Sequence, residues 1–242
     1  MRPDTPQTLR RPFDLGQLIE SAIALYRRHF AEFLAIACVA LPLNVAMSAT
    51  SAIVRDDFAM TTLISLAFTI PMLIIGSLID AAFAGAIAEV DEGTAPDFNR
   101  AYRRVLRRLK DLVLAAIRVY GILILLSLTI IGIPFAAYLG VKWFFFPQSV
   151  ILEECAWDDA LSFSGDLVKG HWWRTLGIIL VVGILGGLPA IAVSSLLSSA
   201  SPIAAALGGA VAGIVALPFT SIGHTLLFFD LSSRGRKDVS SA

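Results

Sequence analysis

Long apolar segments limit what this chain can fold into. One block, from Leu112 to Leu152, would measure about 60 Å as a single helix, which is twice the hydrocarbon thickness of a bilayer. It must therefore fold back on itself, and Gly132-Ile133-Pro134 is the only turn signal near its middle. We expect two membrane-spanning helices from this block alone.

Four other apolar segments are also long enough to cross a bilayer, which takes roughly 20 residues. They cover about 31–54, 58–88, 176–197 and 203–229. Hydrophobic residues make up 57% of the chain and charged residues 16%, against about 45–50% and about 25% in soluble domains. The sequence thus predicts an all-α integral membrane protein with six transmembrane helices. It excludes a soluble α/β enzyme, a disordered chain and a disulfide-stapled module, and Cys38 and Cys155 are expected to be free thiols.

The basic residues are confined to alternate links between these segments. The links on the other side contain only Arg55. Because cytoplasmic loops carry an excess of Lys and Arg, we expect both termini in the cytoplasm. The basic residues that support this orientation are Arg10, Arg11, Arg27, Arg28, Arg100, Arg103, Arg104, Arg107, Arg108, Lys110, Lys169, Arg174, Arg234, Arg236 and Lys237.

Two of these links contain the pattern of an amphipathic helix. Asp14 and Gln17 form a capping box, and Phe13 and Leu18 stand at the positions of a hydrophobic staple. A second helix follows residue 97. At 100° per residue, one side of it is apolar, and the other carries Arg100, Arg103, Arg104, Arg107 and Arg108. One interpretation is that these arginines contact anionic phospholipid headgroups; the other is that they only keep the link on the cytoplasmic side.

An internal repeat is visible around two histidines. The segment 25–36, with His29, matches 167–178, with His171, and a looser match pairs Arg107-Arg108 with Arg27-Arg28. We interpret the chain as one membrane domain, 1–242, built from three copies of an interfacial amphipathic helix followed by a membrane hairpin. The copies are 13–95, 96–154 and 155–232, between a polar tail at 1–12 and another at 233–242. Both histidines are interpreted as interfacial anchors, because no second ligand stands at metal-binding spacing.

Several motifs are similar to those of a known bacterial family. They comprise Pro12-Phe13-Asp14-Leu15-Gly16, Tyr26-Arg27-Arg28, Ile133-Pro134, Trp143, Pro147, Val150-Ile151-Leu152-Glu153, Ala160-Leu161, Ser164, Leu167, Gly170 and Trp172-Trp173. Together they resemble the six-helix membrane domain named after glycerophosphoryl diester phosphodiesterase and related inner-membrane proteins. Phe135 and Gly165 depart from the family pattern. The resemblance implies a membrane domain of unassigned role in the bacterial inner membrane, because the hydrolytic chemistry of that family belongs to a separate soluble domain.

Three ionisable residues fall inside the expected spans. They are Asp80, Arg118 and Lys142, and charged groups at that depth are costly enough to suggest a function. We expect Asp80 to pair with Arg118, Lys142 or both. Such a cluster has two interpretations: it holds helices together, or it lines a polar cavity for an anionic solute or headgroup.

No sequence pattern indicates catalysis. The chain contains no P-loop, GxSxG, HExxH, CxxC or dinucleotide fingerprint, so we expect no metal, no cofactor and no nucleic-acid partner. The first hypothesis is a non-enzymatic membrane protein in envelope or lipid organisation, with membrane lipids, including anionic phospholipids, as partners. The alternative is a small transporter or permease subunit that uses Asp80, Arg118 and Lys142. The oligomeric state stays open.

Overall fold

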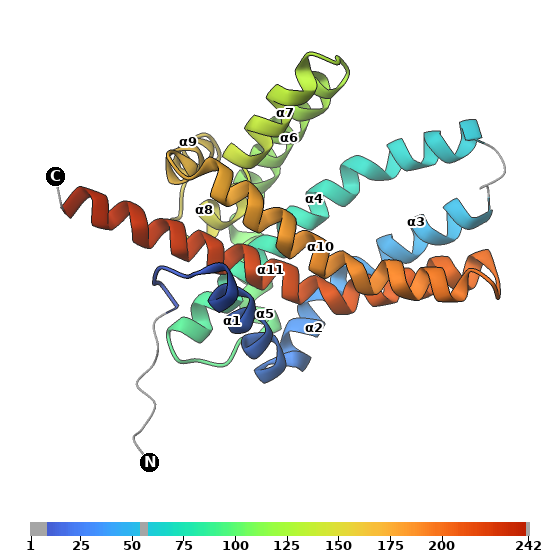
Figure 1. Ribbon diagram of the computed structural model, residues 1–242, viewed down its shortest axis with the longest axis horizontal. Coiled ribbons are helices and arrows are strands. Elements are labelled where there is room, and N and C mark those ends of the chain that lie inside the picture. Colours follow the sequence, from blue (N-terminus) through green and yellow to red (C-terminus); the bar gives the residue numbers. More distant parts are fainter. Residues whose placement is uncertain (1–8, 54–57, 241–242) are drawn as a thin grey trace.

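The computed structural model describes residues 9–53 and 58–240, and every regular element in this part of the chain is a helix (Figure 1). Most of the expected tail at 1–12, and the whole link around Arg55, lie outside the described residues. The side chains of Arg236 and Lys237 do so as well.

Within residues 9–53 and 58–240, five segments are long and apolar enough to cross a membrane, as expected for an integral membrane protein. The first, Phe30–Thr50, joins α2 (Phe30–Ala37), the 3₁₀ helix η1 (Cys38–Ala40) and most of α3 (Leu41–Ile53). The others are Thr62–Asp91 in α4 (Phe58–Asp91), Gly132–Leu152, Trp172–Leu197 as α10, and Pro202–Gly235 in α11 (Pro202–Ser240).

The sixth expected span corresponds to α6 (Leu109–Ser127). This helix has 19 residues, and every stretch of 18 residues within it contains Lys110, Asp111 and Arg118, whereas each of the five segments has such a stretch with at most two charged residues. It lies beside α7 (Gly132–Lys142) in Figure 1. Whether α6 crosses the membrane therefore stays a prediction.

A short helix precedes each group of long helices. The short helices are α1 (Leu15–Arg28), α5 (Phe98–Arg107) and α9 (Trp157–Val168). The residue directly before each of α2, α6 and α10 has similar backbone angles: His29 at φ −123° and ψ 42°, Arg108 at −110° and 16°, and His171 at −122° and 18°. The described part of the chain therefore makes a similar bend three times.

Burial after these bends follows one pattern. The residues four, seven and eleven positions further on are buried in all three segments: Phe33, Ile36 and Ala40; Leu112, Ala115 and Val119; Thr175, Ile178 and Val182. By burial, Arg108 of the middle segment therefore corresponds to His29 of the first. The sequence comparison instead pairs Arg108 with Arg28, so the two alignments differ by one residue. The difference arises because the bend needs a backbone conformation and no particular side chain.

The predicted start of α1 is confirmed. The backbone N–H of Asp14 donates to Gln17 Oε1 over 3.3 Å, as a capping box requires. Phe13 and Leu18 are both buried, which fits the hydrophobic staple. The N-terminal segment is therefore held against the helices behind it.

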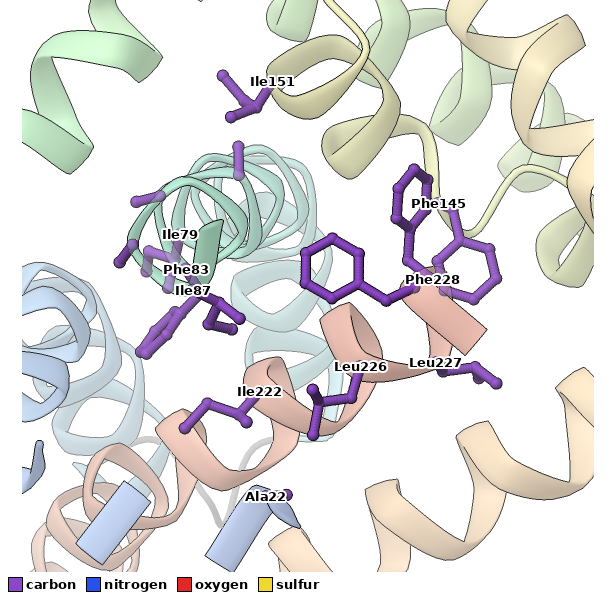
Figure 2. Close-up of a cluster of buried hydrophobic side chains, with 14 of the residues drawn as sticks. Ala22, Ile79, Phe83, Ile87, Phe145, Ile151, Ile222, Leu226, Leu227 and Phe228 are labelled. Atoms are coloured by element: carbon purple, nitrogen blue, oxygen red, sulfur yellow. The ribbon is translucent and has the colours of Figure 1, made fainter. Parts of the chain in front are cut away.

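The main core lies where α11 crosses α4 and the short helices. Figure 2 shows Ile79, Phe83 and Ile87 of α4 close to Ile222 and Leu226 of α11. Phe33 stacks on Phe83 with ring centroids 5.7 Å apart.

The far ends of the hairpins, by contrast, expose apolar side chains. At the α6–α7 turn, Leu128 is 76% exposed, Ile130 88% and Ile131 79%. Such side chains are typical of a surface that faces lipid.

The fourth expected span is broken. α7 ends at Lys142, three residues form a turn, and α8 (Phe146–Leu152) starts next to Pro147. Proline has no N–H and its ring clashes with the preceding turn, so it favours the first turn of a new helix. The helix is therefore completely interrupted before Pro147 and not only kinked.

Candidate functional site

A pocket of about 380 Å³ lies beside this interruption, between α6, α7 and α9. We call it the mixed-charge pocket. Its lining includes two cations and two carboxylates in a small space. The residues around it are Arg118, Lys142, Trp143, Asp158, Leu161, Ser162 and Asp166.

Ser164 of α9 holds the backbone of the interruption in place. Its hydroxyl donates to the carbonyl oxygen of Lys142 over 2.9 Å and accepts from the N–H of Phe145 over 3.1 Å. Ser164 itself is fully buried. One side chain thus provides a hydrogen-bond partner for the carbonyl group of the last residue of α7 and for the N–H group of the residue before α8. Neither backbone group has a partner within a helix.

The position of Lys142 depends on Gly165. A Cβ on Gly165 would come within 2.6 Å of Lys142 Cε, so the lysine stem occupies the space that any other side chain would need. The sequence placed Lys142 near the middle of a span. The structure places it at the end of α7, against the short helix α9, and Lys142 is among the residues that line the mixed-charge pocket.

Arg118 enters the pocket from α6. Its guanidinium carbon lies 5.3 Å from the ring centroid of Trp157, the first residue of α9. Among the described residues, no ion pair joins Arg118 or Lys142 to Asp158 or Asp166. The two positive and two negative side chains of the pocket thus balance in number, but they do not form ion pairs with one another.

Asp80, the third residue of the expected cluster, does not line this pocket. It accepts a hydrogen bond of 2.7 Å from Ser221 Oγ, which links α4 to α11. The structure therefore brings Arg118 and Lys142 together but leaves Asp80 with a hydroxyl partner. The expected carboxylate is replaced by Asp158 and Asp166, which the sequence analysis had not considered because they lie outside the spans.

Some of the arginines on α5 and at its C-terminal end form ion pairs with carboxylates of the protein, and others do not. Arg100 forms an ion pair with Glu89 over 3.3 Å, and Arg108 forms ion pairs with Asp111 over 3.5 Å and Glu154 over 3.6 Å. Arg104 is half-buried and would contact a side chain at Gly85. Arg103 and Arg107 are exposed, and within the described part of the chain neither forms an ion pair.

The apolar side of α5 is packed largely on protein. Ala101 and Val105 are buried, and the hydroxyl of Tyr102 donates to the carbonyl of Ile36 over 2.8 Å. Burial raises the pKa of Tyr102 above its usual range. Leu106, at 64% exposed, is the most exposed large apolar side chain of this helix.

A second charged cluster was missed in the sequence. The carboxylate of Asp230 is fully buried and lies 3.2 Å from Arg174 Nη2 and 2.9 Å from Arg234 Nε. It also accepts from the N–H of Phe13 over 2.7 Å, and both arginines donate to the Phe13 carbonyl. The spacing of Asp230 and Arg234, four residues apart on one helix, was the only local signal.

The histidines lie at structural positions. His29 and His171 stand at the bends after α1 and before α10. His224 packs edge-on against Phe144 with ring centroids 4.7 Å apart, and neither of its buried nitrogens has a hydrogen-bond partner. Over the residues that the structure describes, no three His, Cys, Asp or Glu side chains come together as a metal site.

Comparison with known proteins returns no matching family model, no matching curated protein and no matching solved structure. The resemblance to the membrane domain named after glycerophosphoryl diester phosphodiesterase therefore stays a prediction.

Proposed function

We propose that this chain is a non-enzymatic, multi-pass protein of the bacterial inner membrane that binds phospholipid headgroups and takes part in envelope or lipid organisation. The observation that supports this most is the mixed-charge pocket. It lies where long apolar helices meet a short helix, and it contains cations and carboxylates that are not paired with one another.

The charge pattern of the pocket suits a zwitterionic headgroup. Arg118 and Lys142 offer donors for a phosphate, and guanidinium groups bind phosphate oxygens in a bidentate way. Asp158 and Asp166 offer acceptors for an ammonium group. A headgroup of the phosphatidylethanolamine type carries both charges within a few bonds, so one molecule can satisfy both sides of the pocket.

The interruption between α7 and α8 also favours a binding role. Non-helical backbone at membrane depth is tolerated where protein buries it or where it lines a cavity. Here Ser164 satisfies the backbone, while Lys142 and Trp143 line the pocket. If the only role of this region were to pack α7 against α9, an uninterrupted helix could do so without such a break.

We further propose the six-span repeat, with both termini in the cytoplasm. In this arrangement α6 and α7 form the middle hairpin, and their exposed turn at Leu128, Ile130 and Ile131 faces away from the cytoplasm. Arg103 and Arg107 then lie at the inner leaflet, where each cation contributes about 1 kcal/mol near anionic lipids.

The proposal is tested by native mass spectrometry of the purified protein titrated with phosphatidylethanolamine or phosphatidylglycerol. We expect the double variant Asp158→Asn/Asp166→Asn to weaken phosphatidylethanolamine binding about tenfold. The same variant should bind phosphatidylglycerol more tightly, because the two cations remain and the carboxylates that repel an anion are gone.

Two further variants separate the pocket from general effects. Gly165→Ala should weaken phosphatidylethanolamine binding, because the added methyl group displaces Lys142. Gly140→Ala is the matched control, since its Cβ would make only an ordinary contact of 3.9 Å with Leu123. The proposal would be contradicted if the double variant bound phosphatidylethanolamine as tightly as the wild type does, and phosphatidylglycerol no more tightly.

A small transporter or permease subunit is the alternative. It is favoured by polar groups inside the apolar helices: the Asp80–Ser221 hydrogen bond and the unpartnered nitrogens of His224. Its test is the movement of fluorescently labelled phosphatidylethanolamine between the leaflets of proteoliposomes. Movement that is lost in Asp80→Asn would favour this alternative over a purely organising role.

A further inference from the structure

A second hollow, of about 530 Å³, lies beside α1 and α10 and is separate from the mixed-charge pocket. Arg174 and Arg234 stand in its lining, together with Gly177, Ile178 and Val181, which follow one another along one side of α10. We name this hollow the α10 groove. From the geometry we propose that it binds one anionic phospholipid, with the phosphate at the two arginines and an acyl chain along α10.

The arginines keep binding capacity after their contacts within the protein are made. Both share the single carboxylate of Asp230, which leaves one positive charge in excess in this cluster. Arg174 Nη1 and Asp230 Oδ2 are both buried and have no hydrogen-bond partner. The side chains of Arg174 and Arg234 are nevertheless 28% and 32% exposed, so their guanidinium groups remain accessible to a phosphate in the groove.

The remaining charged residue of the groove, Asp14, is an exposed carboxylate that accepts the backbone N–H of Gln17 in the capping box at the start of α1. It keeps its negative charge, but water and salt screen an exposed charge more strongly than the partly buried charges of the two arginines. The first turns of α1 and α10, represented by Leu15 and Trp173, both border the groove. Helix N-termini carry partial positive charge, so they add to the preference for an anion.

The apolar part of the groove identifies the ligand as a lipid. Gly177, Ile178 and Val181 belong to a helix that is apolar enough to cross a membrane, and Gly177 has no atom within 4 Å of the position of a Cβ. Trp173 lies at the arginine end and is 79% exposed, as is typical of tryptophan at headgroup depth. A free phosphate would use the arginines but not this wall.

The inference goes beyond the proposed function, because it concerns another site and a lipid of net negative charge. The test uses native mass spectrometry of the intact protein titrated with phosphatidylglycerol or phosphatidylcholine. Gly177→Leu fills the groove and leaves the Asp230 cluster untouched. Gly183→Leu is the matched control, because Gly183 lies on the same helix, is exposed, and also has open space around its Cβ.

We expect the wild type and Gly183→Leu to bind phosphatidylglycerol about tenfold more tightly than phosphatidylcholine, and Gly177→Leu to lose this preference. Unchanged phosphatidylglycerol binding in Gly177→Leu would overturn the inference. So would complete competition by millimolar inorganic phosphate, since that result would assign the arginines to a free anion.

The two lipid proposals can fail independently. Gly165→Ala, which alters the mixed-charge pocket, should leave phosphatidylglycerol binding in the α10 groove unchanged. Gly177→Leu should likewise leave phosphatidylethanolamine binding unchanged. Loss of both lipids in Gly177→Leu, with the thermal unfolding temperature of the wild type retained, would contradict a separate groove site.

Discussion

The hydroxyl of Ser164 donates to the carbonyl oxygen of Lys142, and this bond joins α9 to the end of α7. Replacing Ser164 with Ala would leave two buried backbone groups without a partner, those of Lys142 and Phe145. We expect Ser164→Ala to lower the free energy of unfolding by about 1–3 kcal/mol. Thermal unfolding in detergent measures this.

The control for this variant is Ser162→Ala on the same helix. Ser162 is exposed, so its loss should change the free energy of unfolding by less than about 0.5 kcal/mol. Equal unfolding temperatures for the two variants would show that the backbone of the interruption is satisfied in another way.

Gly132 allows the tight turn between α6 and α7. A Cβ at this position would lie 2.0 Å from the carbonyl oxygen of Leu126, and backbone cannot move aside as a flexible side chain can. We expect Gly132→Ala to destabilise the protein by roughly 1–3 kcal/mol, measured by thermal unfolding. Gly140→Ala should cost much less, and a reversed order of the two variants would rule out this packing argument.

Asp230 neutralises two arginines inside the protein. Asp230→Asn would leave Arg174 and Arg234 without a carboxylate and weaken the attachment of Phe13. We expect a loss of about 3 kcal/mol in the free energy of unfolding, at the lower end for a buried pair because the arginines are partly exposed. Glu20→Gln, at an exposed position on α1, is the control and should be almost neutral.

Proteolysis provides a second readout of Asp230→Asn. If the cluster anchors the N-terminal segment, trypsin should cut after Arg10 faster in this variant than in Glu20→Gln. Identical cleavage rates would mean that the cluster does not hold this segment.

Labelling of single cysteines tests the orientation. In a Cys38→Ser background, a membrane-impermeant maleimide should label Cys155 only from the cytoplasmic side. A cysteine introduced as Thr129→Cys (in a background that also lacks Cys155) should be labelled only from the opposite side. Labelling of both positions from the same side would exclude a membrane-crossing α6–α7 hairpin.

The pH dependence of this labelling follows from the surroundings of Cys155. Burial raises the pKa of its thiol, and the carboxylates of Glu153 and Asp159 raise it further, while Arg108 lowers it. Because the thiolate is the reacting form, labelling should be slow at neutral pH and should accelerate as the pH rises through the elevated pKa. Asp159→Asn should accelerate labelling at neutral pH, whereas Asp166→Asn should not.

The long helices could be predicted because the length of an apolar segment is set by the thickness of the bilayer. Local chemistry also predicted the capping box at Asp14 and Gln17. The turn signal at Gly132 marked the start of α7 and not the turn itself, since a proline two positions on suits the first turn of a helix.

The candidate site was less predictable because it depends on residues distant in the sequence. Lys142 is held by Gly165 and Ser164, and no local pattern connects these positions. Asp80 was expected to prefer a cation, yet Ser221 lies against it and supplies a hydroxyl donor. Pairing inside a helical bundle depends on the faces that the helices turn to one another, which hydropathy does not specify.

The bare isoleucines at the α6–α7 turn have a consequence for biogenesis. A protein released into water after this hairpin has formed would expose the apolar α6–α7 turn, which could associate with the same turn of other copies. The growing polypeptide must therefore enter the bilayer while it is still being made. Removal of detergent and lipid from the purified protein should therefore cause aggregation through the α6–α7 turns.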